Sequence, residues 1–230
     1  KPDGNGKLSK RDGDRLGFPV FPTDWKSADD EIYTGYREQG YFPEAFINML
    51  AFLGWNPGTT QELFNLDELV ESFSLNRVAK AGAKFDPDKT KWFQQNYLRA
   101  QSNEDLAIAL GKLTNGSLPN EKLIQIASLM KERAIFVQDM LSDGAYLIAR
   151  PINYDKETIL KKWKSETFEL ISDWLAEIKT ITEFTAENIE VTFKAFLEAK
   201  QIGIGAVLQP FRLCVTGVAA GPGMFDISDF

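Results

Sequence analysis

Apolar residues recur at helical spacing along most of the chain, and very few stretches alternate between apolar and polar positions. Residues 1–26 are rich in Gly, Pro and Asp without a clear period, which predicts a loop with a short extended piece around 18–21. From residue 27 onward, apolar positions three or four apart indicate one face of an α-helix. The pattern predicts a mainly α protein built as successive helical bundles.

Helices are predicted in both halves of the chain. Their expected ranges are 30–37, 43–53, 66–73, 86–98, 120–141, 155–163, 165–180, 185–201 and 204–215. Pro43 suits the first turn of the second helix, and Gly54 suits its end. Thr185 is the expected N-cap of the helix that follows it. The strongest periodicity lies in 120–141, which is therefore expected to be one long helix.

Changes in local composition predict the domain boundaries. The first lies near residue 26, where the irregular segment ends, and the second near residue 100. A further joint is expected at Arg150-Pro151, because the residue before a proline disfavours the helical conformation. The predicted segments are 1–26, 27–100 and 101–230, the last with subdomains of about 101–150 and 151–230.

Composition excludes several kinds of site. The chain has no histidine, which rules out a Ser-His-Asp triad and any His-ligated metal within it, and no metal site is expected. Its single cysteine, Cys214, excludes an internal disulfide and is expected to be buried. Trp163 and Trp174 lie near helical spacing with Ile171 and Ile178, so we expect core packing rather than base stacking. No membrane span or signal peptide is recognisable, so a cytoplasmic location is expected.

Net charge bears on the partner. A formal charge of −7 disfavours nonspecific coating of nucleic acid, which depends on neutralising phosphates. Residues 1–26 and 77–91 are nevertheless locally basic. The charge also leaves open a second hypothesis, a helical module whose acidic helices dock onto a partner protein.

One basic motif lies near the start of the chain. Lys7-Leu8-Ser9-Lys10-Arg11 can place ammonium groups around a polyphosphate and stabilise charge during attack on it. The plainer interpretation is a solvated basic surface loop. It is not a Walker loop, because the glycine spacing of that motif is absent.

Further strings follow this motif in order. They lie at 36–45, 48–55, 73–78, 83–86, 208–217 and 221–227. Together with residues 7–11 they resemble bacterial glutamyl-tRNA synthetases, which are class I aminoacyl-tRNA synthetases. The resemblance covers residues 7–227, and it implies a phosphate-contacting loop, a stem-contact domain and an all-helical anticodon-binding cage in that order.

The resemblance implies a parent enzyme that attaches L-glutamate to tRNA(Glu) using ATP with Mg²⁺, through a glutamyl-adenylate. Its nucleotide-binding domain would lie upstream of Lys1, so this chain is expected to be a carboxy-terminal piece. We therefore expect it to be inactive alone, to hold no cofactor, and to have its basic loop disordered or misplaced. The expected partner is tRNA(Glu), without DNA or membrane, and the expected state is a monomer.

The resemblance also assigns residues. Lys10 would approach the ATP phosphates, with Lys7, Ser9 and Arg11 completing the loop. Four basic residues would contact the tRNA backbone, unless they form an ordinary solvated face. They are Arg77, Lys80, Lys84 and Lys89.

Three residues are expected at the anticodon. Arg133 would read its third base from the first long helix of the cage, the plain alternative being an ion pair with a neighbouring acid. Arg212 would lie near the first two bases. Gly221 occupies a position where many members carry a side chain, so any contact there would be through the backbone. Splayed anticodon bases can be read at their edges by a few arginines, which makes an acidic net charge tolerable.

Overall fold

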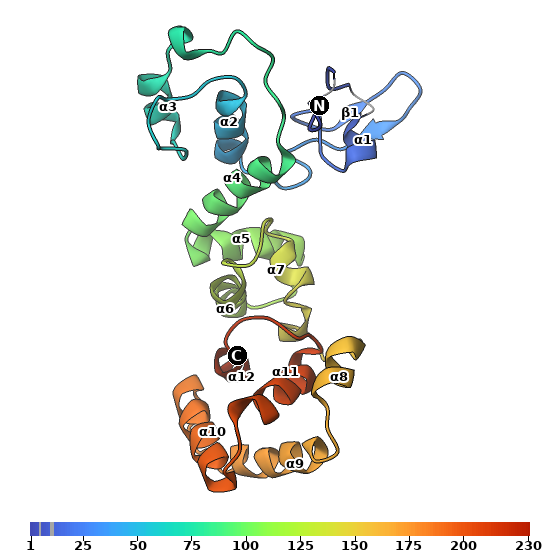
Figure 1. Ribbon diagram of the computed structural model, residues 1–230, viewed down its shortest axis with the longest axis vertical. Coiled ribbons are helices and arrows are strands. Elements are labelled where there is room, and N and C mark those ends of the chain that lie inside the picture. The colour runs from blue at the N-terminus through green and yellow to red at the C-terminus, as the bar shows by residue number, and fades with distance from the viewer. Residues whose placement is uncertain (5, 10–11) are drawn as a thin grey trace. The chain divides into compact units, whose positions relative to one another are not determined.

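The computed structural model describes residues 1–4, 6–9 and 12–230, and helices dominate it (Figure 1). The first part of the chain contains α1 (Asp12–Leu16), β1 (Trp25–Lys26), β2 (Ile32–Tyr33), α2 (Pro43–Phe52), α3 (Leu66–Ser72), η1 (Leu75–Arg77), α4 (Pro87–Ala100) and α5 (Asn103–Leu113). The rest contains α6 (Asn120–Met130), α7 (Asp139–Ser142), η2 (Ala145–Leu147), α8 (Lys156–Lys162), α9 (Thr167–Ile178), α10 (Ala186–Lys200), η3 (Ile204–Ala206), α11 (Leu208–Thr216) and α12 (Met224–Asp229). The predicted mainly α class is confirmed. None of the described helices is both long enough and apolar enough to cross a membrane.

The chain divides into two compact units. Unit 1 comprises residues 1–113 and 131–139, and unit 2 comprises residues 114–130 and 140–230. Residues 131–139 join unit 1 through contacts such as the one from Gln138 Nε2 to the Gln39 carbonyl, at 2.8 Å. The finer division predicted at residues 26, 100 and 150 stays a prediction.

Unit 1 has an aromatic core where α2 packs against α4. Two buried amide side chains join these helices to the loops around them. Gln94 of α4 accepts the Phe42 N–H at 2.8 Å. Asn48 of α2 accepts the Phe64 N–H at 2.8 Å and donates to the Glu62 carbonyl at 2.8 Å. Since both amides are fully buried, these bonds hold the loops before α2 and α3 in defined positions.

The helix predicted at 30–37 is wrong. Residues 32–33 form a strand that pairs antiparallel with residues 25–26. Gly35 lies so close to the chain at Thr23 that a Cβ atom would sit 2.2 Å from the Thr23 carbonyl carbon. The Gly35 N–H donates to Asp24 Oδ1 at 2.9 Å. Contacts with residues distant in sequence thus replace the local helical hydrogen bonds.

The single helix predicted at 120–141 is also wrong. The observed helix in this region, α6, ends at Met130, and the chain turns through 131–138 before α7 begins. The Asp139 carboxylate accepts the N–H groups of Ile135 and Phe136, at 3.1 and 2.8 Å. Such a side chain offers the backbone an alternative to helical bonds, which apolar periodicity does not reveal.

Unit 2 is built around Trp174 of α9, which is fully buried. Its ring lies 5.0 Å from that of Phe193 on α10 and 5.8 Å from that of Phe211 on α11, between ring centroids. The predicted cap Thr185 is confirmed, since its side chain accepts the Asn188 N–H at 3.3 Å.

Two core predictions in unit 2 are wrong. Trp163 is only half-buried, because α8 ends before it and it lies on neither α8 nor α9. Cys214 is exposed, because α11 turns Phe211, Leu213 and Thr216 inward and leaves Cys214 on another face. Apolar neighbours in sequence did not make either position part of the core.

Candidate functional site

The basic loop near the start of the chain is organised around a carboxylate. Asp12 is only 5% exposed, and its Oδ2 accepts the Ser9 N–H and Oγ–H at 2.8 and 2.6 Å. Its Oδ1 accepts from Arg15 Nη2 at 2.8 Å and lies 3.3 Å from Lys1 Nζ. These donors favour the ionised form of the carboxylate and hold the pKa of Asp12 well below its usual range. The hydrogen bond from the Ser9 side chain has the largest effect and the one from Arg15 the second largest.

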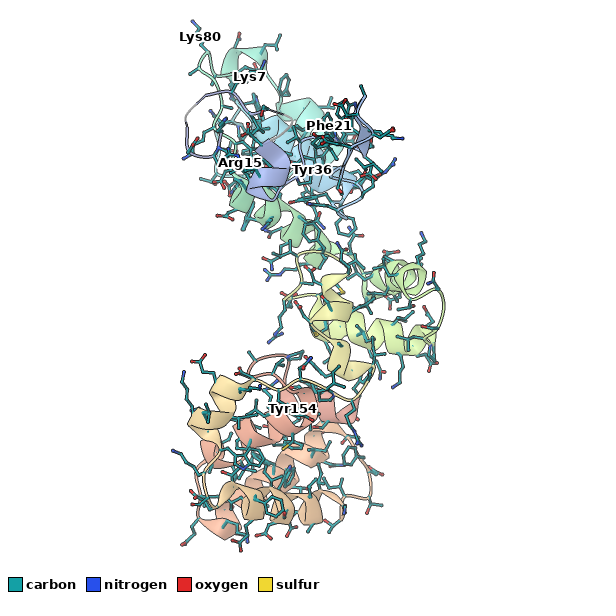
Figure 2. All side chains as sticks on the ribbon, turned by 90° about the vertical axis from the view of Figure 1, so that its right-hand side faces the viewer. Lys7, Arg15, Phe21, Tyr36, Lys80 and Tyr154 are labelled. Atoms are coloured by element: carbon teal, nitrogen blue, oxygen red, sulfur yellow. The ribbon has the colours of Figure 1, made fainter. Side chains whose placement is uncertain are left out.

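This arrangement defines what the predicted loop residues can do. Lys7 is exposed and, among the described residues, forms no ion pair (Figure 2). Ser9 is committed to Asp12 by both of its donors. Lys10 and Arg11 lie outside the described residues, so their phosphate role and the expected disorder of the loop stay predictions. The sequence reasoning missed Asp12, although Ser9 and Asp12 stand three residues apart, a spacing typical of reciprocal capping bonds.

The four residues predicted to contact the tRNA backbone differ in their surroundings. Arg77 donates through Nη1 to the Pro57 carbonyl. Lys89 pairs with Glu62 at 2.7 Å and lies 3.8 Å from the ring centroid of Trp92. The side chains of Arg77 and Lys89 are therefore both engaged in contacts within unit 1.

Lys80 and Lys84 are the two that remain available. Both are exposed in the segment between η1 and α4, and within the described part of the chain neither forms an ion pair. Figure 2 shows Lys80 at an outer edge of unit 1. These two ammonium groups can reach a phosphate without breaking a contact of the fold.

Arg133 lies in the turn after α6, not on the helix where it was expected. It is exposed, while the next residue, Ala134, is buried. The neighbouring acid Glu132 pairs with Arg99, from Nε to Oε2 at 3.3 Å. The ion pair offered as the plain explanation of Arg133 is thus absent among the described residues.

Arg212 and Gly221 come together in unit 2. Arg212 lies on α11, is half-buried, and donates through Nη2 to the Pro222 carbonyl at 2.8 Å. A Cβ atom on Gly221 would lie 3.1 Å from Arg212 Nη1 and 3.1 Å from Tyr146 Oη. Gly221 therefore leaves room for a guanidinium and a phenol to meet over its backbone.

Tyr146 was missed by the sequence reasoning. It belongs to η2, and its hydroxyl also lies 3.8 Å from Met130 Sδ. Nothing in its local sequence marks it, because residues 146, 212 and 221 meet only through the packing of unit 2. A half-buried arginine beside a phenol and an open backbone can offer hydrogen-bond donors to the edge of an unpaired base. Arg133 belongs to unit 1 and is not a member of this cluster.

Two family models match the chain. Residues 93–230 match the model described as an anticodon binding domain. Residues 4–92 match the model described as tRNA synthetases class I (E and Q), catalytic domain. The residues that meet in unit 2 all lie within the first of these matches.

Individual proteins give the same picture. A glutamate–tRNA ligase from Flavobacterium johnsoniae is 50% identical over 99% of this chain and 46% of its own length. One from Christiangramia forsetii is 45% identical over 100% of this chain and 46% of its own length. A crystal structure of a glutamate tRNA ligase from Elizabethkingia meningosepticum aligns with a TM-score of 0.91 and 42% identity, covering 99% of this chain and 46% of that one. The chain thus spans about half the length of the curated relatives it matches.

Proposed function

Since the chain belongs to the family of bacterial glutamate–tRNA ligases, we propose that it supplies the tRNA-binding and anticodon-reading part of such an enzyme. The whole protein attaches L-glutamate to tRNA(Glu) in the cytoplasm, using ATP with Mg²⁺ and passing through a glutamyl-adenylate. The observation that carries this proposal is the meeting of Arg212, Tyr146 and Gly221 within the region that matches the anticodon-binding model.

The proposed anticodon contact is small and specific. The Pro222 carbonyl accepts from Arg212 Nη2 at 2.8 Å and so holds the guanidinium in a defined position. Tyr146 places its hydroxyl at the same position. Arg133 reads another base from the turn after α6. Because unpaired bases are recognised by stacking and edge contacts, an acidic protein can bind here without a large basic surface.

The tRNA body is held separately, by charge. Lys80 and Lys84 contact backbone phosphates, while Arg77 and Lys89 hold the segment that presents them. Such contacts position the tRNA without reading its sequence.

The basic loop at residues 7–11 contributes less than the anticodon cluster to the function proposed for this chain. When bound, ATP would supply the adenylyl group that activates the glutamate carboxylate, with pyrophosphate as the leaving group. Here Asp12 orders Ser9, Lys7 offers an exposed ammonium, and Lys10 approaches the phosphates when the complete site is present. We expect no charging of tRNA by this chain alone. Glutamylation above background, measured with ATP, glutamate and tRNA, would contradict that expectation.

Binding of tRNA(Glu) to the chain tests the proposal. Arg212→Ala should weaken binding by about 1–3 kcal/mol and reduce the preference for the glutamate anticodon. Arg212→Lys keeps the charge but loses the planar fork, so it should lose the preference too. The control is Lys194→Ala, because Lys194 pairs with Glu190 on α10 within the same unit. Equal binding of tRNAs with different anticodons would instead favour the protein-docking hypothesis.

A further inference from the structure

Unit 2 carries a basic surface, on α8 and the residues just after it, that the anticodon contacts leave unused. Its four lysines are Lys156, Lys161, Lys162 and Lys164. All four are exposed. Of the two acids in the same segment, Asp155 is occupied in capping α8, accepting the Thr158 N–H at 2.9 Å. The other, Glu157, pairs with Lys161. Lysines thus exceed available acids here, in a chain whose net charge is −7.

An apolar groove of 410 Å³ includes residues of α8 and of the segment that follows it. Its lining residues are Tyr154, Ile159, Trp163, Leu213 and Cys214. Tyr154 is 43% exposed and Trp163 is half-buried, so both aromatic side chains are accessible. Figure 2 labels Tyr154 in unit 2, beside the ribbon of α11.

A second hollow, of 480 Å³, collects the lysines. Lys161, Lys162 and Lys164 line it together with one acid, Glu166, whose Oε2 accepts the Ser165 hydroxyl at 2.8 Å. Trp163 lines the apolar groove and stands in the chain between two lysines of this hollow. An aromatic groove and a cationic hollow therefore share the segment 161–164, which we call the α8 surface.

We propose that the α8 surface binds an unpaired nucleotide of the tRNA, with its base in the groove and its phosphates at the lysines. Aromatic rings stack on any base, and lysines beside them track the backbone of a single strand. Acidic side chains would satisfy the lysines but offer no flat face to Trp163 and Tyr154, whereas each nucleotide carries both a phosphate and a flat base. This inference rests on the proposed tRNA-binding function and adds a second place of contact.

The α8 surface is distinct from the Arg212 contact. Cys214 and Arg212 are two residues apart on α11, which places them about 200° apart around the helix axis, since a turn takes 3.6 residues. The groove and the guanidinium thus lie on nearly opposite sides of one helix. Changes on the α8 surface should therefore alter affinity without altering the choice of anticodon.

Cys214 provides a direct test, because it is the only cysteine, is exposed and lines the groove. Its rate of modification by a small maleimide is measured with and without tRNA(Glu) at one pH. The rate should fall in proportion to the fraction of protein bound and approach full protection at saturation. Lys162→Gln with Lys164→Gln should weaken this protection and flatten the salt dependence of binding by about 1.4 units, or about 0.7 per single-strand phosphate contact.

Trp163 tests the stacking half of the proposal. Loss of one stacked base by Trp163→Ala should weaken binding about 5- to 150-fold, whereas Trp163→Phe should keep most of the affinity. Should Trp163→Ala fail to fold, the lysine pair decides, since those side chains are exposed. Lys179→Gln is the matched control, because Lys179 is exposed at the opposite end of α9 from the lysine hollow.

The outcomes separate the two proposals. Unprotected Cys214 in a chain that still binds tRNA in an Arg212-dependent manner overturns the α8 inference and leaves the proposed function standing. Absence of any tRNA binding overturns both. Protection of Cys214 by an acidic peptide but not by tRNA overturns the inference in favour of protein docking.

Discussion

Replacing Gly221 with alanine tests the anticodon cluster by adding a single methyl group. The added Cβ would lie 3.1 Å from both Arg212 Nη1 and Tyr146 Oη, whereas ordinary contacts begin at 3.4 Å. The backbone of Gly221 is outside the left-handed region, so alanine itself is unstrained there. The change should therefore act on the neighbouring side chains and leave the fold of unit 2 intact.

The size of the effect follows from the displacement required. Arg212 and Tyr146 must retreat by a few tenths of an ångström. The bond from Arg212 Nη2 to the Pro222 carbonyl is 2.8 Å long, and such a shift moves it toward the limit of a good hydrogen bond. A lost hydrogen bond costs about 0.5–1.5 kcal/mol. Complete loss of this bond sets the upper bound, so affinity for tRNA(Glu) should fall by at most about twelvefold, because 1.4 kcal/mol corresponds to a factor of ten.

Filter binding with tRNA(Glu) and an anticodon variant measures this loss. Gly203→Ala is the matched control, since a Cβ there meets no atom within 4 Å and the position lies in the same unit. In an Arg212→Ala background, Gly221→Ala should have little further effect, because the group it displaces is gone. Equal losses for Gly221→Ala and Gly203→Ala, or full additivity with Arg212→Ala, would refute the reasoning.

Three further predictions concern unit 1. Asn48→Ala should lower the free energy of unfolding by about 2–4 kcal/mol, because it leaves the buried Phe64 N–H and the Glu62 carbonyl without their hydrogen-bond partner. Urea titration measures this loss, and a loss below about 1 kcal/mol would contradict the prediction. The lowered pKa of Asp12 means that its stabilisation is present above its unfolded value of 3.8 and is lost as pH falls toward the lower folded value. The protection of the Ser9 amide, taken relative to its intrinsic exchange rate at each pH, should fall over that range, and Asp12→Asn should remove this fall. Lys84→Gln should flatten the salt slope of tRNA binding by about one unit with anticodon preference unchanged; a changed preference would place Lys84 at the bases.

The local chemistry of the sequence determined where several helices begin and end. Pro43 opens α2, Gly54 follows its end with a φ of +97°, and Thr185 caps α10. The helix α5 was overlooked although its signal was present, since Ser102 Oγ accepts the Asp105 N–H at 3.0 Å. Caps and apolar spacing act within about four residues, so they can be read without a structure.

The sequence also supplied the ordered strings that led to the family, and with them Arg212 and Gly221. It did not supply their surroundings. Tyr146 joins that cluster and Cys214 faces outward through contacts specific to the folded chain. Asp139 breaks the predicted long helix through bonds to backbone groups three and four residues away, a local signal that apolar periodicity does not reveal.

Mainly α architecture, helix caps and membership of the family were therefore properties of the sequence itself. Which side chains share a site was decided only by tertiary packing, because Tyr146 is far from Arg212 and Gly221 along the chain and close to them only in unit 2. The physical reason is range: helical periodicity and caps depend on neighbours one turn away, whereas a site depends on which helix faces are buried against one another.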